Sequence, residues 1–258
     1  MELIHFEIVD NVAKIKLNRP EKFNSFNREM ALQLQKKLDV CEADKNIRAV
    51  FLYSEGKAFC AGQDLAEAID KSGPGIEQIV REHYNPIILK IRNIEKPFVC
   101  AVNGVAAGAG ASLALACDIV IAANSAAFIQ AFGKIGLIPD SGGTYFLPRY
   151  IGLQKAAALM MLGEKIMAKE AQEMGMIYKA FDDAVFLQEG LNIANTLANL
   201  PTRGIGLTKH LLNKSMSNTL EQQLDLEAVM QVKAAKTVDH QEGVKAFFEK
   251  RKPEFKGE

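Results

Sequence analysis

The sequence predicts an α/β fold made of repeated strand–turn–helix units, followed by a helical C-terminal region. Short apolar runs typical of buried strands recur through the first two thirds of the 258 residues. Turns rich in small residues lead from these runs into helical patterns, and strand-like runs stop near residue 195. We therefore expect a core domain over residues 1–195 and a C-terminal helical subdomain over residues 196–258.

The N-terminal segment predicts a hairpin and a helix. Residues 4–9 and 12–17 have strand patterns, and the second alternates apolar residues with lysines. Ser25 or Asn27 can cap a helix that runs to about Cys41, since its apolar residues recur at helical spacing.

A buried strand is expected over residues 48–54. It is followed by a turn of small residues, and Asp64 is placed to cap a helix that starts at Leu65. A longer helix is expected over residues 76–94, kinked or split by Pro86.

Residues 96–124 form the most informative stretch. They predict a buried strand (98–102), a glycine-rich turn (103–110), a buried helix (111–116) and a second buried strand (119–122). Glycines in the turn allow positive φ and close approach of a ligand to the backbone. Free N–H groups at the start of the next helix suit an anion or a developing oxyanion. Close packing of helix on strand is the alternative explanation.

The rest of the chain is expected to contain more helix than strand. A short strand near residues 127–129 precedes a loop that ends in Asp140, and residues 141–143 open a helix. The remainder is mostly helical, with one strand-like piece near 177–181, and Pro201 with residues 204–207 marks a helix boundary.

The central stretch also has features of two other classes of protein. Residues 97–117 carry no charge, which invites a membrane span, but Asn103-Gly104 interrupts the run as a turn signal. The glycines also match a dinucleotide-binding pattern. That pattern belongs after a first strand, however, and the Tyr53–Lys57 pair precedes the glycines in the wrong order.

Composition indicates an ordinary soluble globular protein, and the cysteine content is typical of a cytoplasmic one. The net charge is zero, which argues against nucleic acid or an anionic membrane as a partner. The four cysteines have no metal-ligand spacing and are expected to be reduced core residues. The N-terminus has no secretory signal pattern.

Four blocks in fixed order give the chain a resemblance to the crotonase, or enoyl-CoA hydratase/isomerase, family over essentially its whole length. They are Asn18-Arg19-Pro20 with Asn24, residues 57–65 (KAFCAGQDL), residues 102–119 (VNGVAAGAGASLALACDI) and residues 136–143 (GLIPDSGG). The resemblance implies a crotonase-like spiral of ββα units with a C-terminal helical trimerisation subdomain, assembled as a homotrimer or a dimer of trimers. It also implies an acyl-CoA substrate, with coenzyme A as part of the substrate and no metal or other cofactor.

The family holds a thioester oxygen with two backbone N–H groups while an enolate forms. By resemblance, the donors here are those of Gln63 and Ala109, with Gly108 beside them. Preorganised donors of this kind are typically worth ~3–4 kcal/mol each at the transition state.

The acids and bases point to an isomerase. The two glutamates that hydratases use to activate water fall on Ser112 and Phe132, neither of which can act as a general base. Asp140 remains, at the position of the catalytic aspartate in the family's isomerases. Its alternative is a helix cap; as a base in an apolar pocket, its pKa should be raised.

Residues 136–144, 219–227 and 242–247 are similar to those of the family's phenylacetate-pathway isomerases. These enzymes convert ring-1,2-epoxyphenylacetyl-CoA to oxepin-CoA and also shift the double bond of 3-enoyl-CoA. The resemblance implies that Asp140 removes a proton from C2 of the acyl group.

The resemblance also places coenzyme A. We expect it along Lys22, Phe23, Ala61, Asp64 and Leu65. Phe247 and Lys250, near the C-terminus, would contact the adenine and phosphates bound by a neighbouring subunit; a packed face and a solvated charge are the alternatives.

Two other functions remain open from the sequence. One is an enoyl-CoA hydratase, or a simple 3,2-enoyl-CoA isomerase, of fatty-acid catabolism. The other is an RNA-binding protein of the same fold, which the neutral charge and an idle Asp140 disfavour.

Overall fold

A computed structural model describes residues 2–258 and contains two sheets. The larger has the order β1-β2-β3-β5-β7-β10, and the smaller has the order β4-β6-β8-β9. The strands are β1 (Ile4–Val9), β2 (Val12–Leu17), β3 (Ala49–Ser54), β4 (Ala58–Cys60), β5 (Phe98–Val102), β6 (Val105–Ala107), β7 (Ile119–Ala123), β8 (Ala127–Ile129), β9 (Lys165–Met167) and β10 (Lys179–Phe181).

Twelve α-helices lie between and after these strands in the described residues. They are α1 (Arg28–Ala43), α2 (Leu65–Ala68), α3 (Ile76–Gln78), α4 (Asn85–Asn93), α5 (Ala109–Leu115), α6 (Gly143–Ile151), α7 (Leu153–Leu162), α8 (Ala168–Glu173), α9 (Phe186–Ala198), α10 (Thr202–Ser215), α11 (Leu220–Ala235) and α12 (Val238–Glu249). Short 3-10 segments are η1 (Pro20–Lys22) and η3 (Ala131–Ile135), and η2 (Ile79–Tyr84) is a π-helical segment.

The central strands of the larger sheet, β3, β5 and β7, are buried on both faces, which explains their continuous apolar sequences. In β3, Val50 and Leu52 face the main core, while Ala49 and Phe51 face a second cluster under α9. The side-chain alternation of a strand therefore supplies both cores from one apolar run.

Successive strands pass from one sheet to the other. Strand β3 leads to β4, β5 to β6, and β7 to β8, and each crossing is followed by a helical segment. Because β4, β6 and β8 pair in parallel, the turns that follow them lie at the same edge of the smaller sheet. This arrangement positions the candidate site.

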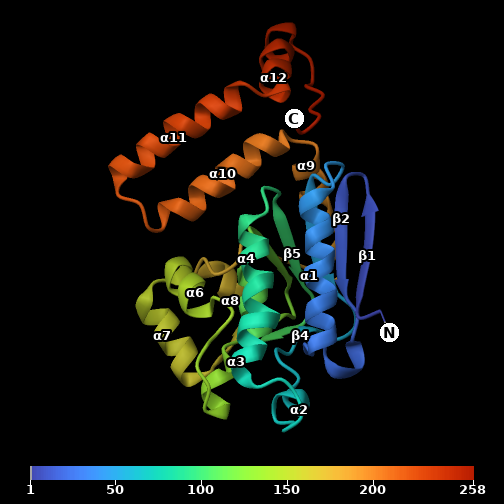
Figure 1. Cartoon of the computed structure of the whole chain (residues 1–258), viewed down its shortest axis with the longest axis vertical. Coiled ribbons are helices and arrows are strands. Elements are labelled where there is room, and N and C mark those ends of the chain that lie inside the picture. The colour runs from blue at the N-terminus through green and yellow to red at the C-terminus, as the bar shows by residue number, and fades with distance from the viewer. Residues whose placement is uncertain (1) are drawn as a thin grey trace.

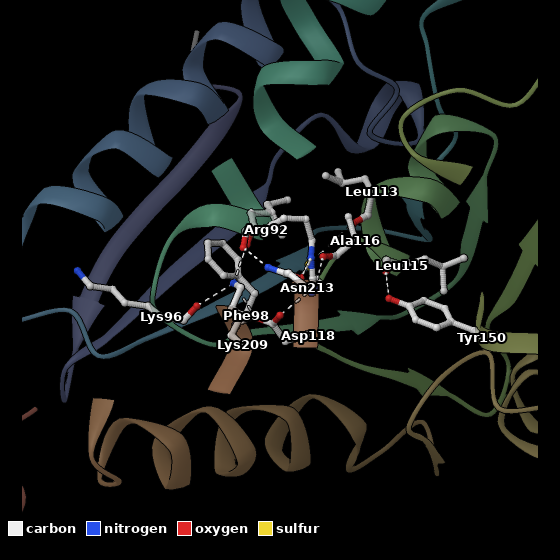
Figure 2. Close-up of polar contacts among 12 residues, drawn as sticks. Arg92, Lys96, Phe98, Leu113, Leu115, Ala116, Asp118, Tyr150, Lys209 and Asn213 are labelled. Carbon is white, nitrogen blue, oxygen red and sulfur yellow. Dashed lines mark hydrogen bonds and ion pairs between the residues drawn. The ribbon is translucent and has the colours of Figure 1, made fainter. Parts of the chain in front are cut away.

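Helices α10, α11 and α12 extend away from the sheets, as Figure 1 shows. Helix α10 is fixed to the core by ion pairs: Lys209 Nζ and Arg92 Nη1 lie 2.8 and 3.0 Å from the two oxygens of Asp118 (Figure 2). The Asp118 carboxylate also accepts the N–H of Phe98 at 2.8 Å. The expected domain division at residue 195 falls within α9, just before this arm.

Most local predictions are confirmed. Asn27 accepts the N–H of Met30 as the cap of α1, and Asp64 accepts that of Ala66 as the cap of α2. The helix around Pro86 is not broken: helical segments run without a gap from Ile76 to Asn93, but the turns before Pro86 are π-helical (η2) and the regular α-helix α4 begins at Asn85. All four cysteines are free and buried, and burial raises the pKa of the Cys60 thiol to about 12.

Three predictions were wrong. Residues 105–107 form β6, although residues 103–110 were expected to be a turn. The mostly helical remainder of the chain was expected to contain one strand near residues 177–181, but it contains two, β9 and β10. Residues 204–207 lie inside α10, so the expected helix boundary is marked by Pro201, the residue before Thr202, and not by these residues. A Cβ on Gly206 would lie 2.4 Å from the carbonyl oxygen of Glu95, so this glycine allows close helix packing.

No helix in the described part of the chain has the length and apolar character needed to cross a membrane.

Candidate active site

Two turns meet at the edge of the smaller sheet. One follows β4 and contains Gly62, and the other follows β6 and contains Gly108. A Cβ added to Gly62 would lie 3.0 Å from the carbonyl oxygen of Ala107 and 3.5 Å from the amide nitrogen of Ala109. Gly62 has φ +92° and Gly108 has φ +52°, which only glycine adopts readily. Glycine is therefore required for this close approach.

Backbone hydrogen bonds between Phe26 and the two residues flanking Gln63 orient the N–H of Gln63 away from Phe26. Phe26 donates to the carbonyl of Gly62 at 2.7 Å and accepts from Asp64 at 2.8 Å. This one-residue parallel bridge directs the N–H of Gln63 to the opposite side. Within residues 2–258, that N–H has no hydrogen-bond acceptor.

The N–H of Ala109 is also free for a ligand. Ala109 is the first residue of α5, so its N–H has no partner within the helix. No other acceptor is found for it in the described chain. Because the helix begins at Ala109 and not at the expected residue 111, this donor lies at the positive end of the helix dipole.

Asp140 lies between η3 and α6 and is partly buried. The hydroxyl of Ser141 donates to its carboxylate at 2.9 Å, and no described cation pairs with it. Burial raises the pKa of Asp140, although the Ser141 hydrogen bond opposes the rise. The direction agrees with the expectation for a base in an apolar pocket.

Asp140 does not cap α6. The cap position is occupied by Gly142, with no side-chain hydrogen bond to the helix. The backbone carbonyl of Asp140 accepts the N–H of Gly143 at 2.8 Å, which leaves the carboxylate free of the helix terminus. The cap alternative is therefore wrong.

Phe132 and Ser112 connect the turn after β6 to the Asp140 loop. The Phe132 ring lies 3.7 Å from the point where a Cβ on Gly108 would be. Ser112 lies one helical turn after Ala109, and its Oγ is 2.8 Å from the corresponding point on Gly143. Helix α5 thus carries the Ala109 donor at its start and contacts the Asp140 loop along its side.

The residues expected to contact coenzyme A divide into two groups. Phe23 accepts the N–H of Ala61 at 3.0 Å, so Lys22, Phe23, Ala61 and Leu65 gather on an exposed rim beside the Gly62 turn. Asp64 lies there too: burial opposes its ionisation, but hydrogen bonds from Arg19 and the N–H of Ala66 outweigh burial and lower its pKa.

The second group is not brought to the site within one chain. Phe247 and Lys250 are exposed and belong to α12 and its C-terminus, at the far end of the molecule from α2 (Figure 1).

A large cavity lies elsewhere, between α4, α6 and α10, with a volume of about 630 Å³. Its charged lining includes Asp118 and the two cations paired with it, Arg92 and Lys209 (Figure 2). The two converging turns are the better candidate for chemistry because their polar groups are free. Among the described residues, no cluster of three or more histidines, cysteines or acids could hold a metal ion.

Sequence reasoning missed the contributions of Ser141 and Gln130. Ser141 has φ +52°, unusual for a residue with a side chain, and its hydroxyl holds Asp140. Gln130 is 2% exposed and its side-chain amide has no partner in residues 2–258. A polar residue in the apolar run AAFIQAF was the one available signal for Gln130.

The arrangement is suited to removing a proton next to a carbonyl group. Two N–H donors can bind an oxygen on which negative charge develops. A carboxylate with a raised pKa and no cation is a more effective base near neutral pH than an ordinary aspartate.

Comparison with known proteins agrees with this fold and site. Residues 7–258 match the family model described as enoyl-CoA hydratase/isomerase. The chain is 47% identical to the 1,2-epoxyphenylacetyl-CoA isomerase of Escherichia coli K12, over 100% of this chain and 99% of that protein.

Solved structures give the same result. An enoyl-CoA hydratase/isomerase from Cupriavidus metallidurans CH34 aligns with a TM-score of 0.92 at 34% identity, covering 100% of this chain and 97% of that one. An enoyl-CoA hydratase from Bacillus anthracis aligns with a TM-score of 0.92 at 34% identity, covering 99% and 100%. The expected crotonase-like fold is confirmed.

Proposed function

Since the chain belongs to the enoyl-CoA hydratase/isomerase family, we propose that this enzyme is an acyl-CoA isomerase that uses Asp140 as its single base. The observation that carries the proposal is the state of Asp140: partly buried, hydrogen-bonded by the Ser141 hydroxyl and by a backbone N–H, without a cation among the described residues, and with a raised pKa. A carboxylate kept for structure would be paired.

The thioester oxygen accepts the N–H groups of Gln63 and Ala109, and Asp140 removes a proton from C2. The electrons of the broken C–H bond move into the enolate, whose oxygen the two donors stabilise. In a 3-enoyl-CoA, the protonated Asp140 then returns the proton at C4 and the double bond moves to C2–C3. The proton is conserved, and neither redox chemistry nor a second base is required.

The finer proposal is that the substrate is 2-(1,2-epoxy-1,2-dihydrophenyl)acetyl-CoA. The bond between the two epoxide carbons breaks as the ring expands to the seven-membered oxepin, in which both C–O bonds are kept. The protonated Asp140 then returns the proton from C2 to the ring carbon at C4, so that the double bond moves to C2–C3 and no atom is gained or lost. The identity to the Escherichia coli epoxyphenylacetyl-CoA isomerase supports this substrate and a role in phenylacetate catabolism. Fatty-acid metabolism is the alternative setting.

We further propose a cytoplasmic homotrimer or dimer of trimers, with residues 196–258 as the helical subdomain. Phe247 and Lys250 would then contact coenzyme A in a neighbouring subunit, while Lys22, Phe23, Ala61, Asp64 and Leu65 contact it within the chain.

The test compares wild type with Asp140→Asn on 3-hexenoyl-CoA and on the epoxide substrate. Asn has nearly the same shape but cannot take the proton. We expect kcat to fall about 100-fold or more on either substrate, the size expected for a positioned base. Full activity of the variant would contradict the assignment.

Hydration of crotonyl-CoA provides the contrast with a hydratase. Ser112 and Phe132 supply no carboxylate to activate water, so wild type should add water slowly. Fast hydration would show that the hydratase alternative is correct. Sub-micromolar RNA affinity would instead support the non-enzyme alternative.

A further inference from the structure

Two buried polar side chains without partners converge beside Asp140. Ser112, on α5, is fully buried, and Gln130, just after β8, is 2% exposed. Ser112 Oγ and both polar atoms of the Gln130 amide form no hydrogen bond with any residue from 2 to 258. Buried polar groups are hydrogen-bonded in the great majority of cases, so three unpaired atoms in one place require an explanation.

Both side chains reach the same point. Ser112 Oγ lies 2.8 Å and Gln130 Oε1 lies 3.6 Å from the position of a Cβ on Gly143. The Cβ of Pro139, the residue before Asp140, lies 3.5 Å from this position. The unpaired groups are therefore next to the Asp140 loop.

The chemistry of the pair favours an oxygen atom as its ligand. The serine hydroxyl and the glutamine amide can each donate one hydrogen bond, and each can also accept one. The structure gives them no ionised partner, which suits a neutral oxygen such as an epoxide, ether or hydroxyl. A hydrocarbon chain would leave all three atoms unpaired.

We infer that Ser112 and Gln130 form a subsite that binds an oxygen atom of the acyl group and so selects oxygenated acyl-CoA substrates over hydrocarbon ones. The inference rests on the proposed acyl-CoA chemistry and adds a substrate class to it. Asp140 performs the proton transfer, and the Ser112–Gln130 subsite determines which acyl groups are held well beside it.

Binding of two non-isomerising thioesters tests the subsite separately from turnover. Phenylacetyl-CoA and 2-hydroxyphenylacetyl-CoA share a skeleton and differ by one ring oxygen. By calorimetry, wild type should bind the hydroxylated thioester about tenfold more tightly, the ratio given by one net hydrogen bond of about 1.4 kcal/mol. Ser112→Ala and Gln130→Leu should each reduce that ratio towards one.

Two controls make the result specific. Asp140→Asn should keep the preference, because the subsite is separate from the base. Thr196→Ala, which removes an exposed hydroxyl bonded within α9, should leave both affinities unchanged.

Thermal unfolding provides an independent measurement. Replacing an unpaired buried polar group with an apolar one of similar size is neutral or stabilising, so Gln130→Leu should unfold at an equal or higher temperature than wild type. A clear fall would show that Gln130 already has a partner and would overturn the inference.

The inference would also be overturned if wild type bound the two thioesters equally tightly. It would be overturned too if both substitutions left the preference for the hydroxylated thioester intact, or if the variants lost affinity for both thioesters equally. Turnover of 3-hexenoyl-CoA by wild type reports separately on the proposed function. The binding data can therefore contradict the subsite without contradicting the isomerase assignment, and the turnover data can contradict the isomerase assignment without contradicting the subsite.

Discussion

Asp118 and Asp140 both follow apolar segments of the chain, yet their surroundings are opposite. Asp118 forms ion pairs with Arg92 and Lys209 and accepts a hydrogen bond from the N–H of Phe98 (Figure 2). Asp140 accepts hydrogen bonds only from neutral donors, the Ser141 hydroxyl and its own backbone N–H, among the described residues. A carboxylate paired with two cations holds elements together, whereas one with neutral donors alone can still accept a proton. Pairing distinguishes a structural acid from a candidate base more clearly than burial does.

The largest expected effect is on stability at the paired acid. Asp118→Ala leaves the buried Lys209 and the partly buried Arg92 without a counter-ion, and should lower the free energy of unfolding by about 3–5 kcal/mol. Denaturant titration measures this change. An effect below about 1 kcal/mol would show that the network does not fix α10 to the core.

Asp140→Asn is the matched comparison, and it should not lower the free energy of unfolding as Asp118→Ala does. The folded-state pKa of Asp140 is raised, so its ionised form destabilises the folded protein at pH values above that pKa. The variant should therefore be at least as stable as wild type at pH 7, and the difference should vanish as pH falls through the folded pKa. A destabilised variant at pH 7 would mean that the carboxylate has a structural partner.

The next effect concerns the N–H of Ala109. Proline is tolerated at the first position of a helix, so Ala109→Pro removes this donor without removing a helical hydrogen bond. We expect kcat to fall about 100- to 1,000-fold, as for loss of one oxyanion donor. Circular dichroism and thermal unfolding serve as controls for the fold. Unchanged kcat in a folded variant would exclude this donor.

A smaller effect is expected at Ser141. Its hydroxyl favours the ionised form of Asp140, so Ser141→Ala should raise the pKa of Asp140 further. The acid limb of the kcat/KM profile should move to higher pH, and Ser141→Cys should move it less. If the acid limb did not move in Ser141→Ala, the Ser141 hydroxyl would have no effect on the pKa of the catalytic base.

The sequence predicted those features that depend on neighbouring residues. Asn27 and Asp64 cap their helices as expected, since a cap involves residues two or three positions apart. The turns at Gly62 and Gly108 were also recognisable from their glycines.

Features that depend on distant contacts were not predictable. Strands β6 and β9 have three residues each and exist through pairing with β4 and β8, not through a local pattern. Gly206 was interpreted as part of a helix boundary, but a glycine is required there because α10 packs closely against the backbone of Glu95. The partners of Asp118, and the absence of partners at Gln130 within the described chain, likewise depend on the assembled fold.

The most direct test of the central claim is the rate at which the C2 protons of phenylacetyl-CoA exchange with D2O, compared between wild type and Asp140→Asn by NMR. This thioester lacks the epoxide and cannot isomerise, so exchange reports proton removal alone. If Asp140 is the base, wild type should exchange these protons and the variant should be about 100-fold slower or more. Equal exchange rates in the two proteins would contradict the account and assign the base to another residue.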